Sequence, residues 1–110
     1  MTTKTRAGIL QSLGFATYGA YLRSPLWKAI RRLVYVHKGR KCVLCGQRAQ
    51  QIHHRRYDRQ TMSGAVLTWL EPLCRKCHEF IEVKPNGRKR AARSVEILFK
   101  TLLKKKKAGA

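Results

Sequence analysis

The sequence of 110 residues contains few acidic residues and no long apolar run. Five acids stand against 25 lysines and arginines, which gives a formal net charge of +20. A chain with this charge repels itself when it is compact, so its expected partner is a polyanion, most commonly nucleic acid. The alternatives are a basic protein that is merely soluble and one that binds an acidic membrane surface. The latter needs a basic amphipathic helix, which this sequence offers only near its C-terminus.

The sequence also lacks the features of a membrane or secreted chain. Polar residues and three glycines interrupt the mildly apolar stretch at residues 8–20, which is too short to cross a bilayer. We therefore expect no contact with a membrane and a cytoplasmic, reducing location. A chain this short builds one domain with a modest core, so a metal or disulfide would help to hold it together.

The four cysteines form two Cys-x-x-Cys pairs, Cys42/Cys45 and Cys74/Cys77, with 28 residues between the pairs. Two thiolates at this spacing can face one ion, and four of them complete the tetrahedral shell that zinc prefers. Such a site has no open position, so we expect a structural zinc and not a catalytic one. Unligated cysteines, or two redox pairs, are the alternatives.

Local patterns predict an α+β chain with three consecutive segments. Residues 1–17 read as a loose basic leader with one weak helical turn, residues 18–87 as a zinc domain, and residues 88–110 as a basic amphipathic helix with a lysine-rich tail. Within the zinc domain we expect a helix over residues 25–36, a strand at 51–54, a polar loop at 55–64, an edge strand within 66–73 and a helix after Cys77. Tyr18 and Trp27 are predicted to be core residues, and Glu71 a surface residue.

Three further residues predict a second metal site. His53 and His54 are neighbours on the predicted strand, so their side chains point to opposite faces. His78 follows Cys77, and Glu82 lies four residues later on the same helix face. One strand histidine can therefore meet His78 and Glu82 at an ion outside the cysteine cluster. The alternatives are that the adjacent histidines are only polar surface and that His78 is a spare zinc ligand.

Taken together, these motifs resemble the HNH (His-Me finger) endonucleases in their zinc-knuckle form. The matching residues are Cys42-x-x-Cys45-Gly46, His53-His54-x-x-Tyr57, Gly64, Leu70-x-x-Leu73-Cys74-x-x-Cys77-His78-x-x-Ile81-Glu82 and the preceding Tyr21-Leu22-x-Ser24-x-x-Trp27. The resemblance covers roughly residues 18–83. It implies a small zinc-bound treble-clef or ββα-metal finger with flanking N- and C-terminal helices.

The resemblance also implies a chemistry. His54 corresponds to the general base that activates water, while His53, His78 and Glu82 correspond to the ligands of a catalytic Mg²⁺ or Mn²⁺. The implied reaction is hydrolysis of DNA phosphodiester bonds by an endonuclease or nickase, in a bacterial or phage setting. One residue departs from the pattern: Trp69 stands where relatives often have Asn or Asp. The Asn or Asp of relatives usually orients the base histidine. In this chain another group must therefore orient the base, or the orienting contact is missing.

Basic residues beside the predicted base are the first candidates for gripping double-stranded DNA. Guanidinium groups pair with phosphates in a bidentate way, but such contacts read no sequence. The candidates are Arg55, Arg56 and Arg59, extended by Arg75 and Lys76. Any one of them could instead be a solvated surface charge. The rival functions are a non-catalytic treble-clef zinc module that binds DNA or structured RNA and, third, a ribosome-associated basic zinc protein. The apolar stripe of the last helix could form a homodimer or pack on its own domain.

Overall fold

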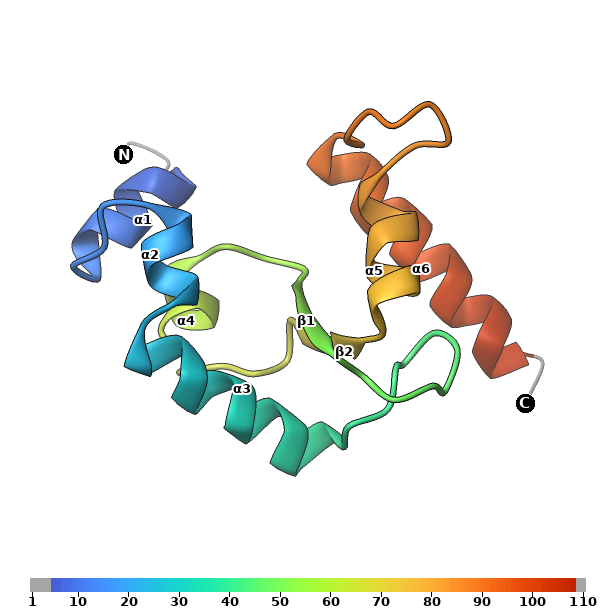
Figure 1. Ribbon diagram of the computed structural model, residues 1–110, viewed down its shortest axis with the longest axis horizontal. Helices are drawn as coiled ribbons and strands as arrows, with labels where there is room; N and C mark the ends of the chain where they lie inside the picture. The colour runs from blue at the N-terminus through green and yellow to red at the C-terminus, as the bar shows by residue number, and fades with distance from the viewer. Residues whose placement is uncertain (1–4, 109–110) are drawn as a thin grey trace. The chain divides into compact units, whose positions relative to one another are not determined.

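The computed structural model describes residues 5–108, and within them it contains six helices and one two-stranded antiparallel sheet (Figure 1). The α+β class is therefore confirmed. The elements are α1 (Arg6–Ser12), α2 (Tyr18–Leu22), α3 (Pro25–Lys38), β1 (Gln51–His54), α4 (Arg59–Met62), β2 (Leu70–Leu73), α5 (Arg75–Glu82) and α6 (Ala92–Ala108). No helix among the described residues is long and apolar enough to cross a membrane.

The chain forms two compact units, and each is described by itself. Of the described residues, the first contains 5–39 together with His54–Glu71, and the second contains Arg40–His53 together with 72–108. The three consecutive segments predicted from the sequence remain a prediction about domain organisation. The parts of that prediction that concern residues 1–4 and 109–110 lie outside the described residues.

The first unit is built on α3, which begins where the sequence predicts. Ser24 Oγ accepts a hydrogen bond from the Trp27 amide at 3.1 Å, and proline occupies the first helical turn. The helix ends two residues later than predicted, at Lys38. Its buried face, which includes Trp27 and Ile30, packs in a core with Tyr21. The Tyr21 hydroxyl donates to the carbonyl of Met62 at 2.7 Å, which joins α2 to the end of α4.

Two predictions in this unit were wrong. Within residues 5–17 the structure has a helix of seven residues, α1, which is capped by Thr5 and buries Ile9 and Leu10. The predicted polar loop at 55–64 contains the short helix α4, where Asp58 accepts a hydrogen bond from the Thr61 amide. Both helices are short and weakly patterned in sequence, so the burial of a few side chains stabilises them more than local propensity does.

The second unit places α5 against α6 beside the cysteine-containing loop (Figure 1). Its core contains Leu73, Ile81, Val95 and Phe99, together with Cys42. The α6 helix begins at Ala92, later than the predicted residue 88, because Lys89 instead forms a bridge with Val83. The apolar stripe of α6 packs on its own unit through Val95 and Phe99, as one of the two sequence-based alternatives proposed.

Candidate metal centres and the histidine pair

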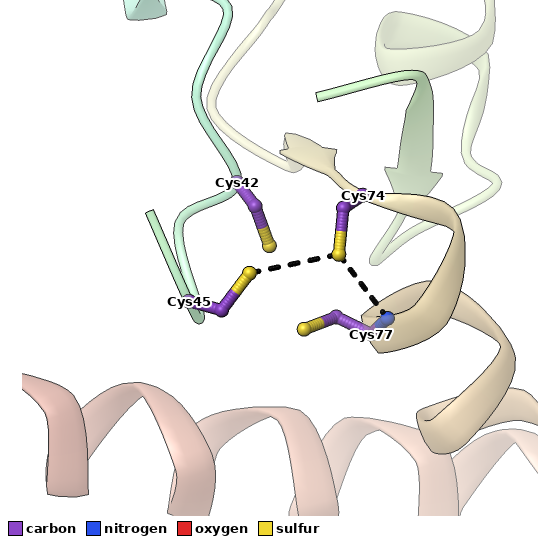
Figure 2. A group of neighbouring side chains, drawn as sticks. All are labelled: Cys42, Cys45, Cys74 and Cys77. Atoms are coloured by element: carbon purple, nitrogen blue, oxygen red, sulfur yellow. Dashed lines mark hydrogen bonds between the residues drawn. The ribbon is translucent and has the colours of Figure 1, made fainter. Parts of the chain in front are cut away.

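The four cysteines gather in one cluster, as the sequence predicts (Figure 2). Cys42 and Cys45 come from the loop before β1, Cys74 caps the N-terminus of α5, and Cys77 lies in its first turn. Their sulfur atoms all lie within 4.8 Å of one another, and Cys45 Sγ is 3.6 Å from Cys74 Sγ. Two thiolates on a tetrahedral zinc ion with bonds of about 2.3 Å would be about 3.8 Å apart. The cluster could therefore hold a metal such as zinc.

The protonation of these thiols is uneven. Burial raises the pKa of Cys42, but hydrogen bonds from backbone amides oppose this and bring its pKa down to about 7. Burial raises the pKa values of Cys45 and Cys77; neighbouring thiols raise that of Cys77 further, whereas a backbone hydrogen bond from Gln47 opposes the rise at Cys45. Four thiolates this close together repel one another, so a bound cation is what would allow all four to lose their protons.

A second group of metal-ligand side chains lies on β1 and α5. The ligand atoms of His53, His78 and Glu82 are within 4.8 Å of one another. Glu82 Oε1 is 3.5 Å from His53 Nδ1 and 3.5 Å from His78 Nε2. These distances are longer than an ordinary N–H···O hydrogen bond. They are somewhat longer than the separation of about 3.0 Å between neighbouring ligands of an octahedral ion with bonds of about 2.1 Å.

Burial and hydrogen bonding support this reading of the trio. The His53 side chain is 3% exposed, and both its ring nitrogens are buried without a hydrogen bond in the described structure. His78 Nδ1 contacts the side-chain oxygen of Gln51, and its Nε2 faces Glu82. The imidazole of His53, and then that of His78, hold the pKa of Glu82 well below its usual range. The carboxylate is therefore ionised, as a metal ligand must be.

His54 has a different environment, in which aromatic residues of the first unit lie against its ring. Its ring stacks on Trp27, with centroids 4.7 Å apart, and on Tyr57, with centroids 5.4 Å apart. Its Nδ1 lies 3.2 Å from the hydroxyl oxygen of Tyr18. The residue is only 4% exposed. Trp27 is a core residue as predicted, whereas Tyr18 adds a polar contact to His54 that the sequence did not indicate.

The arginines predicted to contact nucleic acid differ in their interactions with other residues of the protein. Arg55 Nη1 lies 3.4 Å from Glu71, which also pairs with Lys38 at 3.2 Å. The expectation that Glu71 is a surface residue was wrong: it is 9% exposed, because these two cations neutralise it. Arg56 lies 3.9 Å over the ring of Trp69.

The remaining three candidates are on helices. Arg59 is exposed, and its Nη1 donates a hydrogen bond to Ser12 Oγ at 2.7 Å. Arg75 and Lys76 are exposed in the first turn of α5, where Gln50 Oε1 accepts from the Arg75 amide. The first turn of α5 therefore presents two cations next to the cysteine cluster.

No family model, curated protein or solved structure matches this chain. The case for its function therefore rests on the side-chain geometry described above.

Sequence reasoning missed two residues that support the site. Gln51 could have been found, because residues two apart on a strand share a face and Gln51 is two before His53. Tyr18 could not, because 36 residues separate it from His54 and no local pattern joins them.

Proposed function

We propose that this protein is a metal-dependent endonuclease of the HNH type, which hydrolyses phosphodiester bonds in double-stranded DNA. The observation that carries the proposal is the convergence of His53, His78 and Glu82 on one point, outside the cysteine cluster. The cysteine cluster acts as a structural zinc site, and the second cysteine pair leads directly into α5 in the manner of a treble clef. In this proposal the cysteine cluster stabilises the fold, and the trio of His53, His78 and Glu82 holds the ion that takes part in the reaction.

The roles of the residues follow from their chemistry. A Mg²⁺ or Mn²⁺ ion held by the trio would offset the charge of the phosphate and of the leaving oxygen. His54 directly follows the metal ligand His53 in the chain, so the Cα atoms of the two residues are only about 3.8 Å apart. The neutral imidazole of His54 takes a proton from water while the water oxygen bonds to phosphorus. The P–O3′ bond breaks in the same step, and the O3′ leaving group takes a proton from solvent water, which leaves a 5′-phosphate and a 3′-hydroxyl.

The substrate class is argued from charge. The net charge of +20 attracts a polyanion, and cations near phosphates give affinity without reading sequence. Arg56, Arg75 and Lys76 are exposed and are the first choice for phosphate contacts. Arg59 is exposed as well, whereas Arg55 shares its charge with Glu71.

A second candidate function is a non-catalytic zinc module that binds DNA or structured RNA. The observation that favours it is the enclosure of His54: a ring that is 4% exposed and stacked on Trp27 and Tyr57 could serve as a core residue. The two functions differ in whether the histidine reacts with water or only packs.

Nicking of supercoiled plasmid in the presence of Mg²⁺ or Mn²⁺ separates them. We expect the wild-type protein to nick, and His54→Ala to lower the rate by about 100-fold or more because the general base is lost. His54→Ala should still bind DNA in a gel-shift measurement. His37→Ala is the matched control, because His37 is an exposed residue in the last turn of α3 and belongs to neither site.

Two results would reject the enzyme. Nicking that persists in His54→Ala and in Glu82→Ala would come from a contaminant. Binding without nicking under either metal would support the zinc module instead.

A further inference from the structure

The second unit contains an open groove with a volume of about 590 Å³. Sites that bind small organic groups have volumes of roughly 300–1,000 Å³, so the groove is large enough for one. It is lined by side chains of α5, α6 and the loop before β1, next to Cys77 of the cysteine cluster. The other residues of this α5–α6 groove are Leu44, Lys76, Phe80, Leu102, Lys105 and Lys106. None of them belongs to the metal trio.

The α5–α6 groove combines apolar and positively charged side chains. Leu44 and Leu102 are partly buried and pack against the core of the second unit, whereas Phe80 is 54% exposed. The three lysines of the groove are all exposed, and no carboxylate is among its lining residues. The groove therefore suits a ligand that has both an apolar face and a negative charge.

Helix α5 presents the groove and the metal trio on different faces. Residues four apart lie on the same face of a helix, so Lys76 and Phe80 lie together, as do His78 and Glu82. With 3.6 residues in each turn, Phe80 lies about 160° away from His78 around the helix axis. A ligand in the groove therefore contacts a surface of α5 that the metal trio does not use.

A nucleotide with an unpaired base has the two properties that the groove requires. Its phosphate is negatively charged, and its base has a flat π face that stacks on aromatic side chains. In a duplex the neighbouring base pairs cover these faces, so only an unpaired strand offers one. An extended peptide would instead bring backbone N–H groups that need acceptors, and lysine, leucine and phenylalanine side chains accept no hydrogen bond.

The lining residues also indicate how selective the groove is. No amide, carboxylate or hydroxyl side chain is among them. The groove thus lacks the groups that pair with the edges of adenine or cytosine, and it lacks a side-chain acceptor for the 2′-hydroxyl of RNA. We therefore expect tolerance of sequence and no preference for RNA, so the strand is of the same kind as the DNA of the proposed function.

We propose that the α5–α6 groove binds single-stranded DNA without sequence preference: a base stacks on Phe80, and the three groove lysines contact the flanking phosphates. This inference goes beyond the cleavage of double-stranded DNA at the metal trio. Binding in the groove can be measured whether or not the protein cuts DNA.

The first test measures stacking by the binding of fluorescent oligonucleotides to the zinc-loaded full chain. The probes are an oligodeoxythymidylate of about 12 nucleotides and an abasic strand of the same length, which keeps the phosphates and lacks the bases. We expect Phe80→Ala to weaken binding of the oligodeoxythymidylate about 5- to 100-fold, as when one stacked base is lost, and to leave binding of the abasic strand unchanged. Ile97→Ala is the matched control, because Ile97 is an apolar residue of α6 that is 56% exposed and does not line the groove.

Three results of this test would overturn the inference. The first is a wild type that binds the two strands equally, and the second is a Phe80→Ala protein that loses the same affinity for both or for neither. The third is a helical peptide of glutamate and leucine that binds through Phe80 more tightly than the oligodeoxythymidylate does. That result would assign the groove to an acidic protein partner.

The second test measures the lysine contacts. Lys105→Ala should weaken binding of both strands alike and lower the slope of log Kd against log salt concentration by about 0.7, the effect of losing one phosphate contact on a single strand. Lys104→Ala is the matched control, because Lys104 is exposed in the same lysine run but does not line the groove. Equal effects of the two substitutions would show that the lysine run attracts DNA only by its total charge, and would overturn the lysine contacts.

The failure of this inference and the failure of the nuclease function give different results. Binding through Phe80 in a protein that never nicks plasmid would support the groove and reject the nuclease. Nicking that depends on His54, in a protein whose binding of oligodeoxythymidylate does not depend on Phe80, would reject the groove and leave the nuclease function standing.

Discussion

Gly64 and Gly87 share a backbone conformation but differ in the space around them. Their φ angles are +82° and +85°, a region in which side chains are strained. A Cβ at Gly64 would lie 2.7 Å from Cγ1 of Ile30, whereas a Cβ at Gly87 would meet no atom within 4 Å. The close approach of Gly64 to a buried α3 residue thus requires the absence of a side chain, independently of φ.

We predict that Gly64→Ala lowers the free energy of unfolding more than Gly87→Ala does. Both variants lose about 1 kcal/mol to the unfavourable φ, and Gly64→Ala loses a further amount of about 1–3 kcal/mol because Ile30 must move. Urea denaturation of the two variants measures the difference. Equal losses would mean that Ile30 shifts without cost and that the close approach does not matter.

The positions of site residues were predictable where they depend on spacing. The four-residue interval from His78 to Glu82 places both on one face of α5, and the structure brings their ligand atoms together with His53 as predicted. The burial of Glu71 was not predictable, because it depends on Lys38 and Arg55 reaching the carboxylate from other parts of the chain.

At the scale of the element, α3 shows how a local signal fixes a helix end. Ser24 Oγ accepts from the Trp27 amide and also donates to the Tyr21 carbonyl at 2.6 Å. One hydroxyl therefore caps α3 and satisfies the end of α2. Because Ser24 is buried, water cannot replace either hydrogen bond without entering the core.

We predict that Ser24→Ala lowers the free energy of unfolding by about 1–2 kcal/mol, the usual cost of losing a helix cap. Ser24→Thr keeps the hydroxyl and should retain most of that stability. Thermal unfolding followed by circular dichroism compares the two. A Ser24→Ala protein as stable as the Ser24→Thr protein would contradict the capping role.

The elements that the sequence predicted correctly carry strong end signals or chemistry at fixed spacing. Helix α3 has Ser24-Pro25, and α5 begins at a cysteine pair. The helices that it missed, α1 and α4, have seven and four residues. Helices this short are unstable in isolation, so they exist because Ile9, Leu10 and Met62 are buried by other elements.

At the scale of the whole molecule, the cysteine cluster links folding to metal and pH. Zinc binds thiolates, so protons compete with it for the same sulfur atoms. The raised pKa values of Cys45 and Cys77 mean that both carry protons in the metal-free chain at pH 7, and Cys42, with a pKa of about 7, gains one below that pH. The apparent zinc affinity should therefore fall as the pH falls.

We predict that a chelator added to the zinc-loaded protein reduces the helical circular dichroism signal, with α5 and α6 as the helices lost, and that less chelator is needed at pH 6 than at pH 8. Cys45→Ser should lose the zinc. His53→Ala should keep it, because the four-cysteine site is intact in that variant. Zinc content is measured by elemental analysis. A chelator that removes zinc and leaves the dichroism unchanged would show that the metal does not stabilise the fold.

The sequence by itself determined those features that depend on near neighbours in the chain. These are the two cysteine pairs, the start of α3, the alternation of His53 and His54 along β1, and the shared face of His78 and Glu82. Tertiary structure alone decided which groups surround them: Tyr18 at the Nδ1 of His54, and Lys38 and Arg55 at Glu71. The physical reason is that helix and strand periods fix directions over a few residues, whereas contacts between distant residues depend on how buried faces pack.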